Sequence, residues 1–174
     1  MPSAKSSSPS ITIRKATEID AAKLVAILEG IAAERVYSAI DVVWSAEKQR
    51  TYLASLSDRE VVHVAVIESV KIIGFQVLDL WASTISSMQH VAQIGTFLIP
   101  EFRMRGVGKL LFKATEEFAK SADYAKMIAQ VRASNEHAKA FYRRLGFRAC
   151  GRLARQVRID GVEDDEILME LFLT

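Results

Sequence analysis

The sequence predicts a single α/β domain, and three observations lead to that prediction. Strand-like and helix-like segments alternate in the order β-α-α-β-β-β-α-β-α-β-β. The 174 residues, half of them hydrophobic, are enough to bury one core. No repeat or linker divides the chain after residue 10. We therefore expect one domain over residues 11–174, preceded by a disordered tail over residues 1–10, which are rich in serine and proline.

The first elements are expected to be a strand and two helices. Alternation of apolar residues predicts a strand over residues 11–14. Helical spacing of apolar residues predicts a helix over residues 21–35, with Asp20 as its N-cap. A second short helix is expected to end at about residue 56, with Ser45 as its N-cap.

Three strands are expected next. The apolar runs 61–67 and 72–80 are separated by a short turn, which is typical of a hairpin. Residues 81–89 are polar and irregular, and a further strand is predicted over residues 90–99. Pro100 ends this strand, because proline cannot donate a hydrogen bond to a neighbouring strand.

The last third of the chain alternates helix and strand before it ends in a hairpin. A helix is expected over residues 106–120 and a short strand over residues 127–131. Asn135 is expected to cap the next helix, and Gly146 to end it as a C′ glycine. Asp160-Gly161 between two strand-like segments of residues 147–173 predicts a hairpin turn.

The turn between the fourth predicted strand and the third predicted helix has the features of a phosphate-binding loop. It reads Arg103-Met104-Arg105-Gly106-Val107-Gly108, followed by Lys109. The first N–H groups of a helix have no partner within the helix, so they can bind a diphosphate. Glycine allows close approach, and the arginines supply charge. Alone, the same pattern also fits an ordinary turn before a helix. It matches neither the dinucleotide fingerprint nor the P-loop.

A second motif gives the loop its context. Asn135, Ala138, Tyr142, Gly146 and Phe147 match the pattern N-x-x-A-x-x-x-Y-x-x-x-G-F. Together with the pattern [Q/R]-x-x-G-x-[G/A] in the preceding loop, this motif resembles the GCN5-related N-acetyltransferase (GNAT) family. The resemblance covers roughly residues 11–173.

The resemblance implies a fold and a reaction. The fold is a mixed, mostly antiparallel sheet with helices on both faces, in which the middle strands splay apart at a bulge. The cleft between those strands binds acetyl-CoA, and the acetyl group passes to a primary amine by direct attack in a ternary complex. The loop Arg103–Gly108 and the N–H of Lys109 would then hold the diphosphate.

The resemblance also implies roles for other residues. The backbone N–H groups of Phe97, Leu98 and Ile99 would polarise the thioester carbonyl. Asn135 would contact CoA, cap its helix, or do both. Tyr142 would act as the general acid, because a phenol with a pKa of about 10 can protonate a departing thiolate at neutral pH. Packing of the Tyr142 ring is the alternative role.

The general base stays open at the level of sequence. Asp79, His90 and a water beside Gln93 are the candidates, whereas His63 is expected to pack within a strand and His137 to be exposed. Three further residues are expected to serve mainly in packing, although each has a functional alternative: Cys150 as a nucleophile, and Trp44 and Trp81 as walls of a substrate pocket.

The acceptor is expected to be a small amine, and an amino acid is one such compound. Residues 158–169 resemble the ending of GNAT members that act on amino acids or small amines. The acidic run 163–166 would attract a cation or lie in solvent, and Arg152, Arg155 and Arg158 would hold a carboxylate or lie in solvent. A protein or peptide acceptor and a non-catalytic, CoA-binding regulatory module are the alternatives.

Composition limits the other partners. The net charge of +2 does not require nucleic acid, and the apolar runs are too short to span a membrane. No metal site is predicted from the spacing of ligand residues, and the single cysteine suits a reducing compartment, which leads us to expect a cytoplasmic protein. A homodimer is a further expectation, from the family resemblance.

Overall fold

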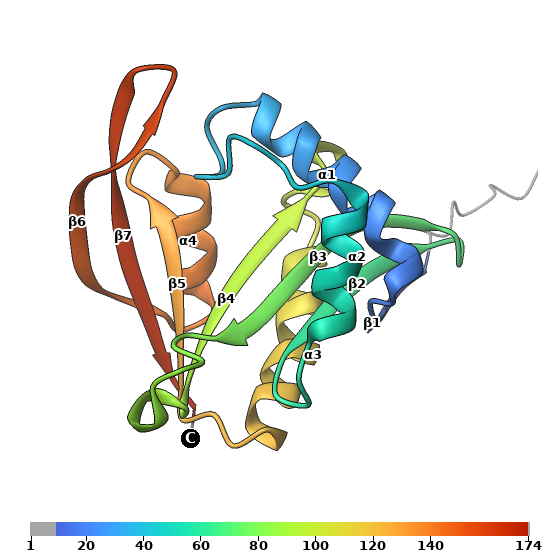
Figure 1. The fold of residues 1–174 in the computed structure, drawn as a ribbon. Helices are drawn as coiled ribbons and strands as arrows, with labels where there is room; N and C mark the ends of the chain where they lie inside the picture. The colour runs from blue at the N-terminus through green and yellow to red at the C-terminus, as the bar shows by residue number, and fades with distance from the viewer. Residues whose placement is uncertain (1–9, 174) are drawn as a thin grey trace, which may run out of the picture.

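A mixed seven-stranded sheet forms the centre of the computed structural model, which describes residues 10–173 (Figure 1). The strands are β1 Ile11–Lys15, β2 Val61–Ile67, β3 Lys71–Leu80, β4 Val91–Leu98, β5 Lys126–Arg132, β6 Arg148–Ile159 and β7 Val162–Phe172. Their order across the sheet is β1-β2-β3-β4-β5-β7-β6. Only β4 and β5 run parallel among these neighbours; the other pairs are antiparallel. The tail predicted for residues 1–10 lies, apart from residue 10, outside the described residues.

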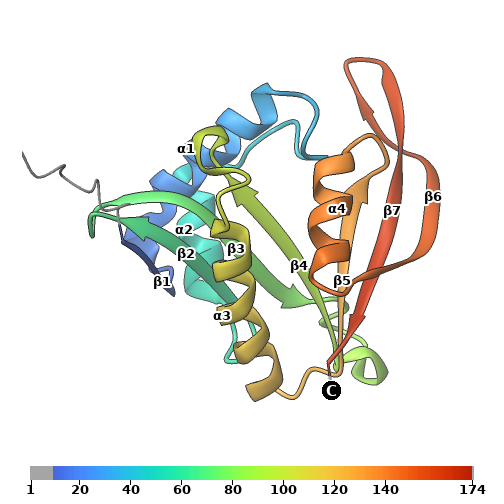
Figure 2. The same ribbon diagram turned by 180° about the vertical axis from the view of Figure 1, so that it is seen from behind.

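Two helices cover each face of the sheet (Figures 1 and 2). On one face lie α1 Ala21–Ala33 and α2 Ala46–Ser55, and on the other lie α3 Val107–Ser121 and α4 Glu136–Arg144. Leu24 and Leu28 of α1 pack on Val64 and Phe75 of the sheet, and a second core surrounds Met127 on the α3/α4 face. The structure thus confirms the predicted fold class and order of elements.

Most of the predicted helix ends are confirmed. Ser45 Oγ accepts a hydrogen bond from Lys48 N at 3.2 Å, and Asn135 Oδ1 accepts one from Ala138 N at 3.0 Å. Gly146 follows α4 with a φ of 95°, the left-handed conformation expected of a C′ glycine. Asp160 and Gly161 form the β6–β7 turn, with φ values of 51° and 79°.

Asp20 occupies the N-cap position of α1, as predicted, but its side chain makes no capping hydrogen bond to that helix. Asp20 belongs to a short 3-10 turn, Glu18–Asp20, that precedes α1. Its carboxylate accepts a hydrogen bond from Thr17 N at 2.8 Å and pairs with Arg14 at 2.7 Å. The side chain therefore caps this turn and ties it to β1, rather than bonding to the first turn of α1.

The two parallel strands separate halfway along their length. Pairing of β4 with β5 runs from Val91↔Lys126 to Ile94↔Ala129 and then stops, while β4 continues to Leu98 beside β3. Figure 1 shows the two strands diverging above this point. The bulge expected at this point is absent: the pairing of β4 with β3 and the pairing of β4 with β5 both run without a shift in register. The strands separate because β5 stays paired with β7 while β4 stays paired with β3.

Within residues 10–173, no helix has the length and apolar character needed to cross a membrane.

Candidate active site

A cleft of about 650 Å³ opens where β4 and β5 diverge. Residues 93–98 of β4 and 130–132 of β5 form two of its walls. Residues 37–40, in the segment between α1 and α2, form a third wall, and α4 contributes side chains from the other face of the sheet. The separated strands therefore create the space, and segments distant in sequence enclose it.

Tyr142 projects from α4 into this region and is 4% exposed. Its phenol oxygen lies 3.1 Å from Oγ1 of Thr96, which is on the separated part of β4. Burial raises the pKa of Tyr142 to about 12, so the phenol keeps its proton at neutral pH. The ring also packs edge-on against Phe141 and Phe147, at 5.1 Å between centroids in each case. Tyr142 is thus a packing residue whose protonated phenol lines the cleft.

A buried amide orients the hydroxyl next to Tyr142. Gln76 is fully buried in β3, and its Nε2 donates to Thr96 Oγ1 at 2.7 Å. With one lone pair occupied in this way, Thr96 can direct its own hydrogen to the Tyr142 oxygen. The Tyr142 hydrogen is then free to point into the cleft. Sequence reasoning missed Gln76 and Thr96, because only the strand pairing brings them to Tyr142.

The glycine turn starts α3 as predicted, and its two glycines serve different purposes. Gly106 is the N-cap residue with a φ of 82°, a conformation that side chains disfavour. A Cβ on Gly108 would lie 2.8 Å from the Phe141 ring, so Gly108 allows α3 and α4 to pack closely. Val107 opens the helix, and its N–H lacks an i−4 partner within α3, as at any helix start. The Val107 N–H and the space left by the glycines fit a bound diphosphate, whereas the Lys109 N–H, predicted for the same role, donates to Gly106 O at 3.1 Å.

The two arginines of the turn differ in their surroundings. Arg103 is held by Glu34, with nitrogen–oxygen distances of 2.8 and 2.5 Å, and it lies over the Tyr37 ring. The hydrogen bonds to Glu34 raise the pKa of Arg103, whose charge Glu34 neutralises. Arg105 is exposed beside the Phe102 ring, and Met104 and Lys109 are also exposed. Arg105 and Lys109 are therefore the side chains of this turn that offer charge to a phosphate.

Some of the backbone groups at the end of β4 are hydrogen-bonded to β3. Ile99 N donates to Ile73 O at 3.1 Å, whereas Leu98 O accepts a bond from Arg103 Nε at 3.1 Å. Amide directions alternate along a strand, so Phe97 N faces β3 as Ile99 N does, and Leu98 N faces the diverging side. Of the amides predicted to polarise a carbonyl, Leu98 is the one whose direction suits that role.

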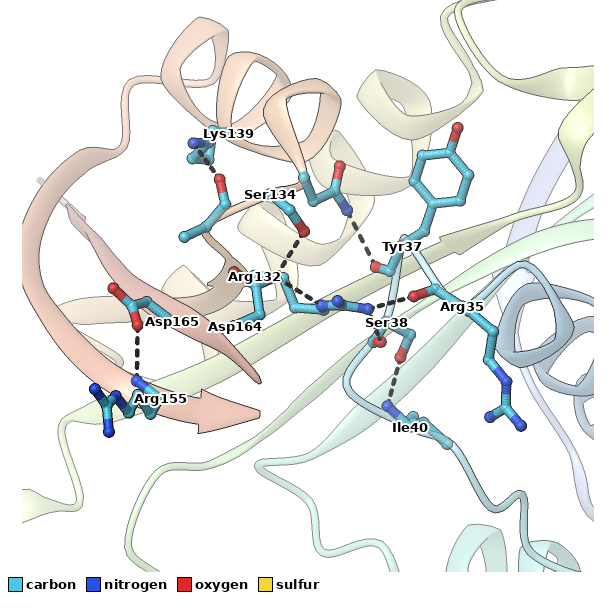
Figure 3. A network of polar contacts seen from close by, with 12 residues as sticks. Arg35, Tyr37, Ser38, Ile40, Arg132, Ser134, Lys139, Arg155, Asp164 and Asp165 are labelled. Atoms are coloured by element: carbon cyan, nitrogen blue, oxygen red, sulfur yellow. Dashed lines mark hydrogen bonds and ion pairs between the residues drawn. The ribbon is translucent and has the colours of Figure 1, made fainter. Parts of the chain in front are cut away.

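A hydrogen-bond network fixes the segment between α1 and α2 against the far side of the cleft (Figure 3). Asn135 Nδ2 donates to Tyr37 O at 3.1 Å, in addition to capping α4. Arg132, at the end of β5, donates to Arg35 O at 2.6 Å and pairs with Asp164 at 2.9 Å. The bonds to Tyr37 and to Arg35 join residues nearly a hundred positions apart. Arg132 was missed from sequence, and Asp164 was named only as part of the acidic run 163–166, because no local pattern marks such pairs.

Asp79, a candidate for the base, and His63, expected to pack within a strand, do not line the cleft. Asp79 accepts a hydrogen bond from Tyr52 Oη at 2.6 Å, and burial raises its pKa. His63 is buried with Nδ1 2.9 Å from Thr115 Oγ1, and burial lowers its pKa to about 4. The side chains of both residues serve packing within the fold, as expected for His63.

The cleft wall holds a different set of polar residues. Gln93 and the exposed His137 contribute to it, but His90 does not. Glu166 also lines the cleft and is 7% exposed. Sequence reasoning placed Glu166 in an acidic run without separating it from its neighbours. Pairing of β7 with β5 is what brings it to this wall.

The remaining candidates lie outside the cleft. Cys150 is exposed, and partial burial raises the pKa of its thiol, which disfavours the nucleophilic thiolate. Trp44 packs edge-on against Tyr52 and Trp81 is half-buried, and neither lines the cleft. Among residues 10–173, no group of three or more His, Cys, Asp or Glu side chains is placed to hold a metal ion.

Comparison with known proteins agrees with this geometry. The model of the acetyltransferase (GNAT) family matches residues 24–147. The chain therefore belongs to the acetyltransferase (GNAT) family, and the predicted enzyme class, an acetyl-CoA-dependent N-acyltransferase, is confirmed. No curated protein matches the sequence.

Solved structures share the fold over nearly the whole chain. A GNAT acetyltransferase from Streptococcus pneumoniae superposes with a TM-score of 0.84 at 24% identity, covering 95% of this chain and 100% of that one. A ribosomal-protein-alanine N-acetyltransferase from Brucella melitensis gives 0.86 at 24% identity, covering 93% and 99%. A phosphinothricin acetyltransferase from Sinorhizobium meliloti, in complex with acetyl-CoA, gives 0.86 at 20% identity, covering 94% and 88%. At these identities the likeness concerns the fold.

Proposed function

We propose that this chain transfers the acetyl group of acetyl-CoA to the primary amine of a small molecule, an amino acid or a related amine. The observation that carries the proposal is the wall that residues 37–40 form along one side of the cleft, which stays open to solvent elsewhere. Arg132 and Asn135 hold the segment between α1 and α2 across the space next to Tyr142. A cleft of about 650 Å³ bounded in this way suits the reacting end of CoA and a small acceptor.

Residues of the chain supply the steps that acetyl transfer requires. Acetyl-CoA supplies the activated acetyl thioester. The first turn of α3, with Arg105 beside it, binds a diphosphate. The Leu98 N–H stabilises negative charge on a carbonyl oxygen, as an oxyanion-hole donor does. Tyr142 donates its proton to a departing thiolate, and its buried position keeps that proton available.

Direct attack by the amine is favoured over an acyl-enzyme. A covalent route needs an activated nucleophile within reach of the thioester. Cys150 is exposed on β6 and is not part of the cleft wall. The amine and the thioester must then be bound together, side by side in one cleft.

The test is thiol release from acetyl-CoA by the purified protein, measured against a panel of amino acids, alkyl amines, polyamines and short peptides. Turnover with small amines and not with peptides supports the proposal. A preference for peptides would assign a protein acceptor instead. A third outcome is that the protein binds acetyl-CoA and turns over no amine, with Tyr142→Phe leaving that binding unchanged. This result would favour the alternative of a non-catalytic, CoA-binding regulatory module. The homodimer, the cytoplasmic location and the domain limits 11–174 stay predictions.

A further inference from the structure

Glu166 differs from the other carboxylates of the run 163–166. The other three each have guanidinium partners: Glu163 pairs with Arg155 and Arg158, Asp164 with Arg132, and Asp165 with Arg152. Within residues 10–173, no basic side chain lies within ion-pair distance of Glu166, although the residue is 7% exposed. Burying a carboxylate without a counter-ion is costly, so the charge favours a cationic ligand.

Neutral amides hold the Glu166 carboxylate in place. Gln93 Nε2 donates to Gln130 Oε1 at 2.9 Å, and Gln130 Nε2 donates to Glu166 Oε2 at 2.9 Å. This chain joins β4, β5 and β7 at the level where β4 and β5 separate, since Ile94↔Ala129 is their last pair. The amides fix the direction of the carboxylate without neutralising its charge.

The second oxygen of Glu166 is available to a ligand. Oε1 takes part in no hydrogen bond within the described residues, and the side chain lines the same cleft as Thr96 and Tyr142. An ammonium group in this cleft would find a fixed carboxylate oxygen, and a charge-assisted hydrogen bond of this kind is roughly twice as strong as a neutral one.

The guanidinium groups of the cleft wall are already occupied. Arg103 is held by both oxygens of Glu34, and Arg132 by Asp164 and by two backbone carbonyls. A carboxylate on the acceptor would have to compete with these partners. The uncompensated charge in the cleft wall is therefore the negative charge of Glu166.

We propose that Glu166 binds the ammonium group of the acceptor, and that the acceptor is a cationic amine without a carboxylate beside its amino group. This inference rests on the proposed function and narrows its substrate class to alkyl amines, diamines or amino amides. The ammonium bound by Glu166 loses one proton to bulk water, and the freed lone pair attacks the carbonyl carbon. The carbon–nitrogen bond forms and the carbon–sulfur bond breaks. Tyr142 protonates the sulfur, and the second proton lost from nitrogen restores the phenol.

Matched acceptors test the substrate class. Phenylalanine, phenylalaninamide and phenethylamine share a side chain and differ in the carboxylate. We expect kcat/KM at least about tenfold higher for the compounds without a carboxylate. The carboxylate of an amino acid would find no free positive charge in the cleft wall, and a binding site discriminates strongly against a charged group left unpaired. Equal or better turnover of the zwitterions overturns the inference while the proposed function stands.

Glu166→Gln tests the residue itself. Glutamine keeps the volume and can still accept the Gln130 hydrogen bond, but it lacks the charge. We expect KM for the amine to rise at least about tenfold, with the Kd of acetyl-CoA changed less than about twofold. Glu163→Gln, at an exposed site on the hairpin, is the control and should change neither value.

The remaining outcomes separate the two proposals. An unchanged amine KM in Glu166→Gln, or equal losses of amine and acetyl-CoA affinity together with a lower Tm, would give Glu166 a structural role and overturn the inference alone. Wild-type protein that binds acetyl-CoA and acetylates no amine would overturn the proposed function, and this inference with it.

Discussion

The two sides of the cleft are assembled from the sequence in different ways. The donor side, where we propose that acetyl-CoA binds, consists of the end of β4, the glycine turn before α3, and Tyr142 of α4, all within residues 96–142. The acceptor side, where we propose that the amine binds, joins residues 35–40 to Arg132 of β5 and to Asp164 and Glu166 of β7. Local sequence patterns specify the first, whereas only the completed sheet brings the second together. Variants on the donor side should therefore act on acetyl-CoA and on chemistry, and variants on the acceptor side on stability and on the amine.

The largest effect is expected from Arg132→Ala on the acceptor side. The change leaves Asp164 largely buried without its guanidinium partner and removes the bonds to the segment between α1 and α2. We expect the free energy of unfolding to fall by about 3 kcal/mol, the lower end for a broken buried ion pair. Chemical denaturation measures this change. Arg158→Ala, which removes an exposed pair, should cost less than about 0.5 kcal/mol, and equal losses would contradict the distinction.

Tyr142→Phe should produce the next largest effect, in the rate of transfer. Phenylalanine keeps the ring contacts with Phe141 and Phe147 and removes the proton donor. We expect kcat to fall about 100-fold, the lower range for a lost general acid, with little change in acetyl-CoA affinity. Steady-state thiol release gives both values. A kcat within about threefold of wild type would assign Tyr142 to packing alone.

The pH profile gives a second view of Tyr142. Burial raises its pKa to about 12, and the protonated form is the active one. Loss of this proton should therefore not lower kcat until the pH approaches 12, so kcat should show no decline attributable to the phenol between pH 8 and about 10. A decline with an apparent pKa near 10 that is lost in Tyr142→Phe would contradict the buried environment.

Gly108→Ala tests how closely α3 and α4 pack at the diphosphate end. The added Cβ would lie 2.8 Å from the Phe141 ring, and accommodating it should cost about 1 to 3 kcal/mol of stability. Gly30→Ala in α1 is the matched control, because nothing lies within 4 Å of that Cβ. The control should stabilise the helix by about 0.5 to 1 kcal/mol. Thermal unfolding measures the stability of both variants. If Gly108→Ala stabilises the protein as Gly30→Ala does, the close packing of Gly108 against Phe141 is refuted.

Arg105→Gln should have the smallest effect. It tests whether Arg105 supplies positive charge to the phosphates of acetyl-CoA at the glycine turn. Arg105 is exposed, so a contact with phosphate is screened by solvent. We expect the Kd of acetyl-CoA to rise about 2- to 5-fold, and less so at high salt. Binding measured by calorimetry at two salt concentrations checks this, and an unchanged Kd at low salt would remove Arg105 from the site.

The parts of the structure that the sequence predicts are those governed by local rules. Asn135 and Ser45 cap their helices, Gly146 and Gly161 adopt positive φ, and the turn at Gly106 starts α3, because neighbouring residues decide each of these features. Asp20 stands at the predicted N-cap position of α1, but its carboxylate bonds to Arg14 and to the turn before α1 instead of to the helix.

The parts that the sequence does not predict depend on pairing between distant segments. Glu34 neutralises Arg103 from 69 positions away, and no local pattern marks that partner. Along β7, alternation sends Glu163 and Asp165 to the arginines of β6, while Asp164 and Glu166 face Arg132 and Gln130. The four acidic residues therefore look alike in the sequence, although their side chains face two different sets of partners in the structure.

The most direct test of this account is the initial-rate pattern when acetyl-CoA and a reactive small amine are varied together. If one cleft holds both substrates and the amine attacks directly, double-reciprocal plots should give lines that intersect. Parallel lines, the signature of a ping-pong reaction through an acyl-enzyme, would contradict the account, because the acetyl group would then leave CoA before the amine binds.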